Sequence, residues 1–223
     1  MASTLTLELK HQYYYEHERG EILALVPNTA RTVLDVGCAA GNLGRSIKAK
    51  NPSVILTGIE LQQGITQSGI YEQVHIGDVE KIIPDMSLNE QRFDCIICTD
   101  VLEHLNDVWK VLEAASNMLM PDGIIIASLP NIRHISIMKQ LVLHGMWEYE
   151  KEGIMDKTHL RFFTERSVKK VFEDSGLDVR SIQFKEYLPT QAVKLFIVGI
   201  IKRIRIFRDL FAFQLIVVAT KRK

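Results

Sequence analysis

The segment Asp100-Val101-Leu102-Glu103-His104 holds two carboxylates and an imidazole within five residues. If a helix begins here, Asp100, Glu103 and His104 share one face, because residues three and four positions apart are neighbours on a helix. An imidazole titrates near neutral pH, so His104 is suited to take a proton from a substrate hydroxyl. A structural role is also open, because Asp100 as N-cap with Glu103 three residues later makes a capping box that satisfies free backbone N–H groups.

A second segment, Val33 to Gly44, has the residue types of a ligand-binding turn. The apolar run around Asp35 predicts a buried strand, and the small residues after it predict a tight turn into a helix. Gly37 and Gly41 let the backbone approach a ligand closely. Asp35 is predicted to lie at the strand end, inside the turn, where its charge repels a phosphate. The turn therefore suits a cationic ligand, and S-adenosylmethionine carries both an ammonium and a sulfonium group.

Four successive predicted strands end in an acid: Asp35, Glu60, Asp78 and Asp100. In open α/β sheets, ligands bind outside the carboxyl ends of the strands. Glu60 is placed to accept hydrogen bonds from both ribose hydroxyls of a nucleoside. Asp78 is placed to accept one from an adenine amino group, with Leu61 or Val79 against the ring. These acids predict a nucleoside site along one edge of the sheet.

The elements that must position these residues alternate along the chain. The predicted strands are 33–36, 54–60, 71–76, 93–99, 124–129, 179–187 and 211–220. The predicted helices are 43–50, 101–120, 165–175 and 191–208, with a turn at 121–123 and a poor helix at 62–70. Repeated strand–helix units favour an α/β fold: a Rossmann-like, doubly wound, seven-stranded and mostly parallel sheet with an antiparallel edge strand. No repeat or linker interrupts the pattern, so we expect a single domain over residues 1–223.

Composition argues against several classes of protein. Lys plus Arg and Asp plus Glu both number 27, so no net charge indicates a nucleic-acid partner. Three cysteines make no disulfide framework, and Cys95 and Cys98 would point to opposite faces of a strand. With no signal peptide and no apolar run that could span a bilayer, we expect a cytoplasmic protein. The basic helix predicted over 191–208 suits either a core helix with exposed cations or a peripheral contact with an anionic membrane.

Together these motifs resemble those of the class I S-adenosylmethionine-dependent methyltransferases, from about Tyr14 to Thr220. The matching segments are Val33–Gly41, Gly58–Glu60, Gly77–Val79, Phe93–Leu105 and Met120–Gly123. The resemblance implies that Asp35, Gly37 and Gly41 hold the methionine end of the cofactor, and that Cys38, Ala39 and Asp100 also lie against it. An N-terminal cap helix within residues 1–30 is expected over the turn, with Tyr14 at the cofactor. Ala39 and Ala40 depart from the pattern, because the family commonly has a second glycine there.

The segment 100–104 and the later Thr158-His159 resemble the ubiquinone-biosynthesis O-methyltransferases. They also resemble the Glu-x-x-Glu-His…His metal site of the small-RNA 2′-O-methyltransferases. These resemblances imply that Asp100, His104 and His159 are catalytic, and that with Glu103 they hold Mg²⁺ or Mn²⁺. Such an ion lowers the pKa of a bound hydroxyl. Asp100 is shorter than the Glu of that motif, and without a metal His104 or His159 is the expected general base.

The predicted activity is O-methylation of a hydroxyl on a small molecule, a glycan or a quinone-like precursor. Residues 130–160 are long for a connection after a strand, so they are expected to form a substrate lid. In it, Trp147 and Tyr149 are placed to stack on a substrate ring or sugar, and for Trp147 packing in the core is the alternative. Two alternatives stay open. One is a non-catalytic module that binds S-adenosylmethionine, and the other is an NAD(P)-dependent oxidoreductase, which would need the second glycine that residues 37–44 lack.

Overall fold

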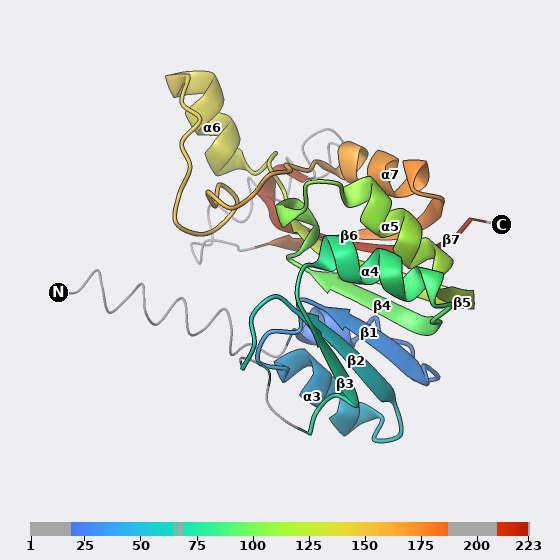
Figure 1. Cartoon of the computed structure of the whole chain (residues 1–223). Coiled ribbons are helices and arrows are strands. Elements are labelled where there is room, and N and C mark those ends of the chain that lie inside the picture. The colour runs from blue at the N-terminus through green and yellow to red at the C-terminus, as the bar shows by residue number, and fades with distance from the viewer. Residues whose placement is uncertain (1–18, 65, 67–68, 187–208, 223) are drawn as a thin grey trace.

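A seven-stranded sheet runs through the molecule in the order β3-β2-β1-β4-β5-β7-β6 (Figure 1). The computed structural model describes residues 19–64, 66, 69–186 and 209–222, so Tyr14 and the helix predicted over 191–208 lie outside the described residues. The strands are β1 (Thr32–Val36), β2 (Ile55–Glu60), β3 (Gln73–Ile76), β4 (Phe93–Thr99), β5 (Leu119–Pro130), β6 (Leu177–Glu186) and β7 (Ala212–Lys221). The first five pair in parallel, and β7 runs antiparallel to both β5 and β6. The predicted fold class is confirmed, with the antiparallel β7 one place inside the edge strand β6.

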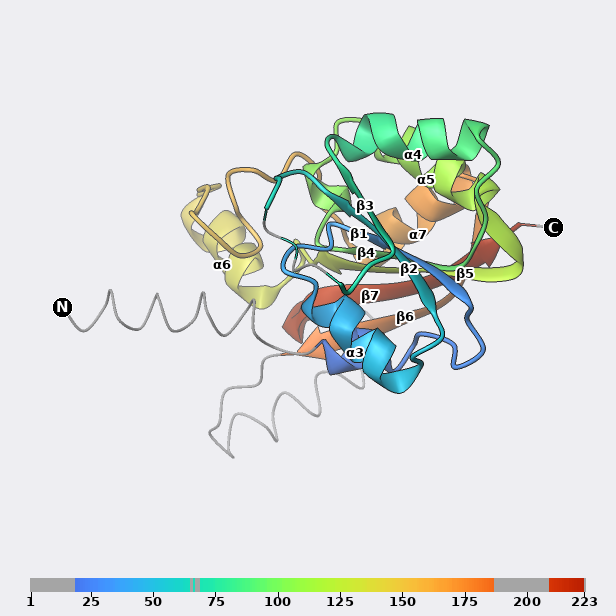
Figure 2. The same ribbon diagram turned by 60° about the horizontal axis from the view of Figure 1, so that its bottom comes forward.

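Helices cover both faces of this sheet. The described helices are α2 (Gly20–Leu23), α3 (Asn42–Lys50), α4 (Val79–Leu88), the 3-10 turn η1 (Leu102–His104), α5 (Val108–Asn117), α6 (Ile135–His144), which projects away from the sheet (Figure 1), and α7 (Glu165–Asp174). Figures 1 and 2 show α4, α5 and α7 on one face and α3 on the other. The buried apolar side chains form one large cluster on each face. No helix in the described ranges is long and apolar enough to cross a bilayer.

The side chains of β4 alternate between the two faces of the sheet, and this separates Cys95 from Cys98. Cys95 belongs to one apolar cluster and Cys98 to the other, because successive side chains of a strand point to opposite faces. Both are buried and free, and burial raises the pKa of Cys98 to about 12. The prediction that this pair does not converge is confirmed.

The helix predicted over 101–120 is wrong in its first part. The 3-10 turn η1 follows β4, and α5 begins only after Asp107, whose carboxylate accepts a hydrogen bond from the Lys110 N–H at 3.1 Å. The η1 turn is preceded by Val101 and has no side-chain cap, while Asp100 has a φ of +53°. The predicted capping box of Asp100 and Glu103 is therefore wrong, and the backbone turn instead buries Glu103.

Other boundaries differ for local reasons. The turn predicted at 121–123 falls within β5, where the pairing with β4 shifts register: Phe93 pairs with Leu119 and Cys95 with Ile124. The helix α4 was not among the predicted elements, and it contains Pro84, a residue that normally disfavours a helix interior. The described residues of 62–70 form no helix.

The predicted lid, residues 130–160, contains α6 and a loop that folds back on itself through a bridge between Glu150 and Asp156. Its role in binding substrate stays a prediction, as does the single-domain organisation.

Candidate active site

The turn between β1 and α3 has three residues with positive φ: Gly37 at +72°, Ala39 at +45° and Gly41 at +84°. Gly37 makes room for the segment after β4, because a Cβ there would lie 2.6 Å from Val101 Cγ2. Gly41 is the N-cap of α3, and its Cβ would lie 2.9 Å from Ile70 Cδ1. The predicted cofactor turn, Gly37–Gly41, therefore touches the segment that leads into η1.

Glu60 is the last residue of β2, and its carboxylate joins two backbone turns. One oxygen accepts a hydrogen bond from the Ala39 N–H at 2.9 Å, and the other accepts from the N–H groups of Leu61 and Gln62 at 2.8 and 3.2 Å. These bonds fix the carboxylate beside the Gly37–Gly41 turn. A carboxylate oxygen has two lone-pair directions, so Glu60 retains one, on the oxygen that accepts from Ala39, for a ribose hydroxyl.

The residues predicted at the adenine end lie at the ends of β2 and β3. Leu61 is 67% exposed, although it follows a buried strand directly. Asp78 is the N-cap of α4 and accepts a hydrogen bond from the Glu80 N–H at 2.9 Å. Val79, the first residue of α4, packs partly against the apolar cluster on that face. Leu61 is thus the apolar side chain of this group that is free to lie against a ring.

Asp35 lies inside β1 rather than in the turn, which corrects the predicted position. Its side chain is 1% exposed and accepts a hydrogen bond from the Tyr71 hydroxyl at 2.6 Å. Burial raises the pKa of Asp35 to about 6, against the lowering effect of the Tyr71 bond. The carboxylate is therefore bonded to Tyr71, whose ring would lie 3.2 Å from a Cβ at Gly41 in the adjoining turn.

Cys38, within the Gly37–Gly41 turn, has a buried side chain. Its Sγ is 3.5 Å from the Thr66 hydroxyl, which also donates to the Ala39 carbonyl at 2.8 Å. Burial raises the pKa of Cys38 to about 11, so the thiol is neutral near pH 7. This residue supports the turn by packing.

Asp100 is held by residues distant in the sequence. Arg19 Nη2 donates to its carboxylate at 2.9 Å, Gln214 Nε2 at 2.8 Å and the Ser128 hydroxyl at 3.0 Å. These partners come from the start of α2, from β7 and from β5. The prediction that Asp100 converges with Glu103 and His104 is therefore wrong. Its carboxylate is already bonded to three other side chains, so Asp100 is a poor candidate for a ligand of a shared metal.

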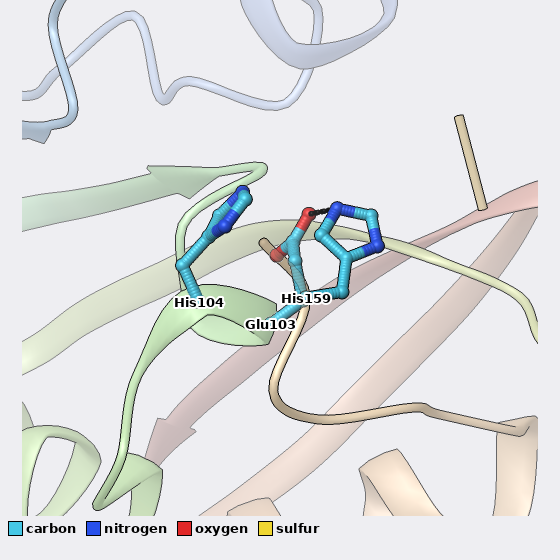
Figure 3. Close-up of side chains that lie close together, drawn as sticks. All are labelled: Glu103, His104 and His159. Atoms are coloured by element: carbon cyan, nitrogen blue, oxygen red, sulfur yellow. Dashed lines mark ion pairs between the residues drawn. The ribbon is translucent and has the colours of Figure 1, made fainter. Parts of the chain in front are cut away.

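The structure does bring Glu103, His104 and His159 together, and we call these three residues the acceptor centre. Figure 3 shows the Glu103 carboxylate between the two imidazoles. His159 Nε2 lies 4.0 Å from Glu103 Oε1, the two rings are 4.8 Å apart at their centroids, and one ligand atom from each residue falls within 4.8 Å of the others. Two backbone bonds from Leu160 and Arg161 to the Glu103 carbonyl, at 2.8 and 3.0 Å, hold the His159 segment in place.

The protonation of the acceptor centre follows from its hydrogen bonds. His159 Nδ1 is 3.0 Å from the Ile154 carbonyl, and His104 Nδ1 is 3.2 Å from the Thr158 carbonyl. Because a carbonyl oxygen only accepts, each Nδ1 carries a hydrogen, so in the neutral form of either ring the lone pair is on Nε2. Burial also lowers the pKa of His159, which keeps that ring neutral.

Glu103 is the unusual member of the centre. It is 1% exposed, and both of its carboxylate oxygens are buried without a hydrogen-bond partner. Burial, together with the charge of Asp100, raises the pKa of Glu103 well above its ordinary value. A buried carboxyl group with no donor is costly, so the arrangement favours a positively charged or hydrogen-donating guest.

Sequence reasoning did not identify Arg19 and Tyr71 as part of the site. No local signal marks Arg19, whose partner Asp100 is 81 residues away. For Tyr71 the sequence holds a weak signal, the glycines at positions 44 and 58. A Cβ at Gly44 would collide with the Tyr71 hydroxyl group, and a Cβ at Gly58 would lie 3.3 Å from the Tyr71 ring. Glycines on two separate elements thus make room for one tyrosine.

Comparisons with known proteins agree on the kind of protein. A family model described as a methyltransferase domain matches residues 9–182. The ubiquinone biosynthesis O-methyltransferase of Neisseria meningitidis serogroup C is 26% identical over 165 residues, which span 70% of this chain and 68% of that protein. The protein of the same name from Leptothrix cholodnii is 27% identical over 165 residues with the same coverage.

Solved structures extend the likeness of the fold over nearly the whole chain. A S-adenosylmethionine-dependent methyltransferase from Archaeoglobus fulgidus aligns with a TM-score of 0.65 at 18% identity, covering 96% of this chain and 99% of that one.

Proposed function

The chain belongs to the methyltransferase family whose model it matches, and it is a class I S-adenosylmethionine-dependent methyltransferase. From that premise we propose that it methylates a hydroxyl oxygen of a small molecule or glycan. Family membership rules out the alternatives of an oxidoreductase and of a non-catalytic module. The relatives named as O-methyltransferases are distant, so the choice of a hydroxyl acceptor depends on the chemistry of the acceptor centre.

On the cofactor side, Glu60 is proposed to bind a ribose hydroxyl and Leu61 to lie against the adenine ring, with Asp78 near its amino group. The Glu60 carboxylate is already oriented by three backbone N–H groups, so little order is lost when a ribose binds. The buried charge of Asp35 is proposed to favour the sulfonium over a neutral sulfur. Tyr14, which lies outside the described residues, stays a prediction.

One observation carries the proposed acceptor chemistry. The Glu103 carboxylate is buried with neither oxygen hydrogen-bonded, and the Nε2 lone pairs of His104 and His159 lie in the same centre. Val101, two residues before Glu103, lies against the Gly37–Gly41 turn, since a Cβ at Gly37 would be 2.6 Å from Val101 Cγ2. Such a centre accepts a proton from a hydroxyl placed near the sulfonium.

The proposed reaction is an in-line displacement. The methyl group passes from the sulfonium to the acceptor oxygen, and the hydroxyl proton passes to Nε2 of His104 or His159. The products are S-adenosylhomocysteine, a methyl ether and an imidazolium. The chain's main contribution is to position the oxygen against the methyl group and to exclude water.

As an alternative to the general base, the acceptor centre fits a divalent cation, which would occupy the same Nε2 lone pairs and activate the hydroxyl in place of the imidazoles. Both imidazoles donate Nδ1–H to a backbone carbonyl, which is the usual second-shell arrangement of metal-bound histidines. The unpaired Glu103 carboxylate would supply the third ligand. One carboxylate and two imidazoles suit Mn²⁺ better than Mg²⁺, which prefers oxygen ligands alone. When bound, such an ion lowers the pKa of an acceptor hydroxyl.

Transfer of labelled methyl groups to catechols, quinone precursors and sugar diols tests this proposal. We expect Glu103→Gln, His104→Ala and His159→Ala to lose methyl transfer by at least 100-fold, on the order expected for lost general-base or metal catalysis, while calorimetry shows unchanged binding of S-adenosylhomocysteine. His144→Ala is the matched control, because His144 is an exposed imidazole at the end of α6. EDTA should abolish activity, and Mn²⁺ should restore it.

The outcomes separate the two parts of the proposal. Activity that survives EDTA but not the histidine variants would remove the metal and leave the general base. Activity that survives both would show that the acceptor centre has no catalytic role.

A further inference from the structure

The loop that follows His104 is held by a carboxylate from another helix. Glu80, in the first turn of α4, accepts hydrogen bonds from the Asn106 N–H at 3.2 Å, the Asn106 side-chain amide at 2.9 Å and the Asp107 N–H at 2.7 Å. Burial acts to raise the pKa of Glu80, but these bonds and the charge of Arg161 together hold that pKa below its ordinary value. Because α4 and α5 lie side by side (Figures 1 and 2), the ionised Glu80 fixes the loop between η1 and α5 to α4.

The same loop is also held by Arg161, which comes from the segment that carries His159. The guanidinium group of Arg161 donates a hydrogen bond to the Asn106 carbonyl and lies over the Trp109 ring, 5.4 Å from the ring centroid. The Arg161 N–H donates to the Glu103 carbonyl at 3.0 Å. Asn106 is thus bonded to a carboxylate through its N–H and its side-chain amide, and to a guanidinium group through its carbonyl.

These contacts join the two segments that carry the histidines of the acceptor centre. His104 lies two residues before Asn106. His159 lies two residues before Arg161. His104 Nδ1 is 3.2 Å from the carbonyl of Thr158, in the same segment as Arg161. The orientation of the His104 ring therefore depends on how its loop lies against the segment of Thr158, and the bond between Arg161 and Asn106 fixes that relation.

The apolar core holds the fold of this region independently of these polar contacts. Leu102, Leu105 and Val108 are buried in the large apolar cluster on that face of the sheet. Trp109 by contrast is 40% exposed, and Nε of Arg161 is buried without a hydrogen-bond partner among the described residues. A buried donor that is left unpaired lowers stability, so stabilisation of the fold does not by itself account for Arg161.

Glu80 also connects this loop to the edge of the sheet where the nucleoside is proposed to bind. The Glu80 N–H donates to the carboxylate of Asp78, the N-cap of α4, at 2.9 Å. One residue therefore contacts the proposed adenine end through its backbone and the loop after His104 through its side chain. The start of α4 and that loop are thereby held in a fixed relation.

We propose that Glu80 and Arg161 are positioning residues for methyl transfer. Both act through Asn106 and so keep the two imidazoles of the acceptor centre in one orientation. This proposal rests on the proposed function of that centre, but it applies equally to a general base and to a bound metal. The expected effect is large because a misplacement of reacting groups by about 1 Å costs on the order of 100-fold in rate.

NMR of the imidazole nitrogens, on the full chain with isotope-labelled histidine in EDTA, tests the positioning without any acceptor. In the neutral wild type, His104 and His159 should carry the hydrogen on Nδ1, with their signals assigned through His104→Ala and His159→Ala. We expect Arg161→Ala and Glu80→Ala to shift the His104 ring toward the Nε2–H tautomer, which predominates in free histidine, because the bond to Thr158 is then lost.

Methyl transfer to catechols, quinone precursors and sugar diols supplies the second readout. We expect kcat to fall on the order of tenfold in Arg161→Ala and Glu80→Ala, with S-adenosylhomocysteine binding within a few-fold and Tm lowered by at most about 2–4 °C. Because both side chains act through Asn106, the double variant should lose no more activity than the more affected single variant. Arg92→Ala is the matched control, since Arg92 also donates to a backbone carbonyl, that of Gln91 at 2.9 Å. It should change neither readout.

The proposal is overturned if the His104 signals of Arg161→Ala and Glu80→Ala match those of the wild type, or if kcat is unchanged although those signals shift. Independent, additive losses in the double variant would also contradict it. If Arg161→Ala does not fold, Arg161→Lys carries the same test, because it keeps the charge but not the planar group, and a smaller shift in the same direction is expected. Methyl transfer that survives in His104→Ala and His159→Ala would instead remove the proposed function, whatever the imidazole signals show.

Discussion

Replacement of Ala39 by glycine should stabilise this protein, although glycine usually destabilises. Ala39 has a φ of +45°, and its N–H and carbonyl are tied to Glu60 and Thr66, so the turn cannot relax. The left-handed conformation costs a residue with a Cβ about 1–2 kcal/mol. The greater freedom of glycine in the unfolded chain returns about 0.5–1 kcal/mol of that. The net expectation for Ala39→Gly is a gain of about 0.5–1 kcal/mol.

Differential scanning calorimetry measures this effect, and the expected rise in Tm is about 1–4 °C for a chain of this size. Ala40→Gly is the matched control, because Ala40 is not among the described residues with positive φ; it should lower Tm slightly. Binding of S-adenosylhomocysteine should stay within a few-fold in both variants. If Ala39→Gly destabilises as much as Ala40→Gly does, the assigned backbone strain is wrong.

Three further predictions concern the buried charges. Because burial raises the pKa of Asp35 from its ordinary 3.8 to about 6, the folded state holds this proton more tightly than the unfolded state does. The free energy of unfolding of the wild type relative to Asp35→Asn should therefore fall by about 2–2.5 kcal/mol as pH rises from 4 to 7 in urea titrations, and a flat difference would contradict the burial argument. Because the pKa of Glu103 is also raised, Glu103→Gln should have a higher Tm than the wild type in EDTA at pH 8.5. The difference in Tm between the two proteins should be smaller at pH 6, and an equal difference at both pH values would mean that Glu103 carries no buried charge. Arg19→Ala removes the 2.9 Å bond to Asp100 and should lower stability by about 1–2 kcal/mol in the same titrations, whereas an unchanged midpoint would show that this half-buried pair contributes nothing.

The fold was predictable because its signals are local. Apolar runs such as Phe93–Thr99 are buried on both faces of a parallel sheet, and they read as strands without knowledge of their partners. The helix predicted over 165–175 begins as expected, because Thr164 forms a capping box with Ser167 at the start of α7. The helix at α4 was not predicted, and Pro84 within it gives the opposite local signal.

The site was predictable only where sequence neighbours form it. Glu103 and His104 lie together because they are adjacent, although a 3-10 turn and not an α-helix presents them. Asp100 could not be placed in the same way. Its partner Gln214 is 114 residues away, and no spacing rule connects them. Resemblance to known motifs supplied His159, whose position depends on the packing of the whole 154–161 segment against Glu103.

Binding of the cofactor to the Glu60 variants tests the central claim most directly. Calorimetric titration with S-adenosylmethionine, S-adenosylhomocysteine and NADH should show that both nucleosides bind the wild type and that NADH does not. Glu60→Gln should weaken S-adenosylhomocysteine at least tenfold, on the order of one charge-assisted hydrogen bond lost, with Asp122→Asn, a surface strand position away from this edge, as control. Equal affinity of the wild type and Glu60→Gln, in a variant with unchanged Tm, would contradict the assignment of the ribose to the end of β2.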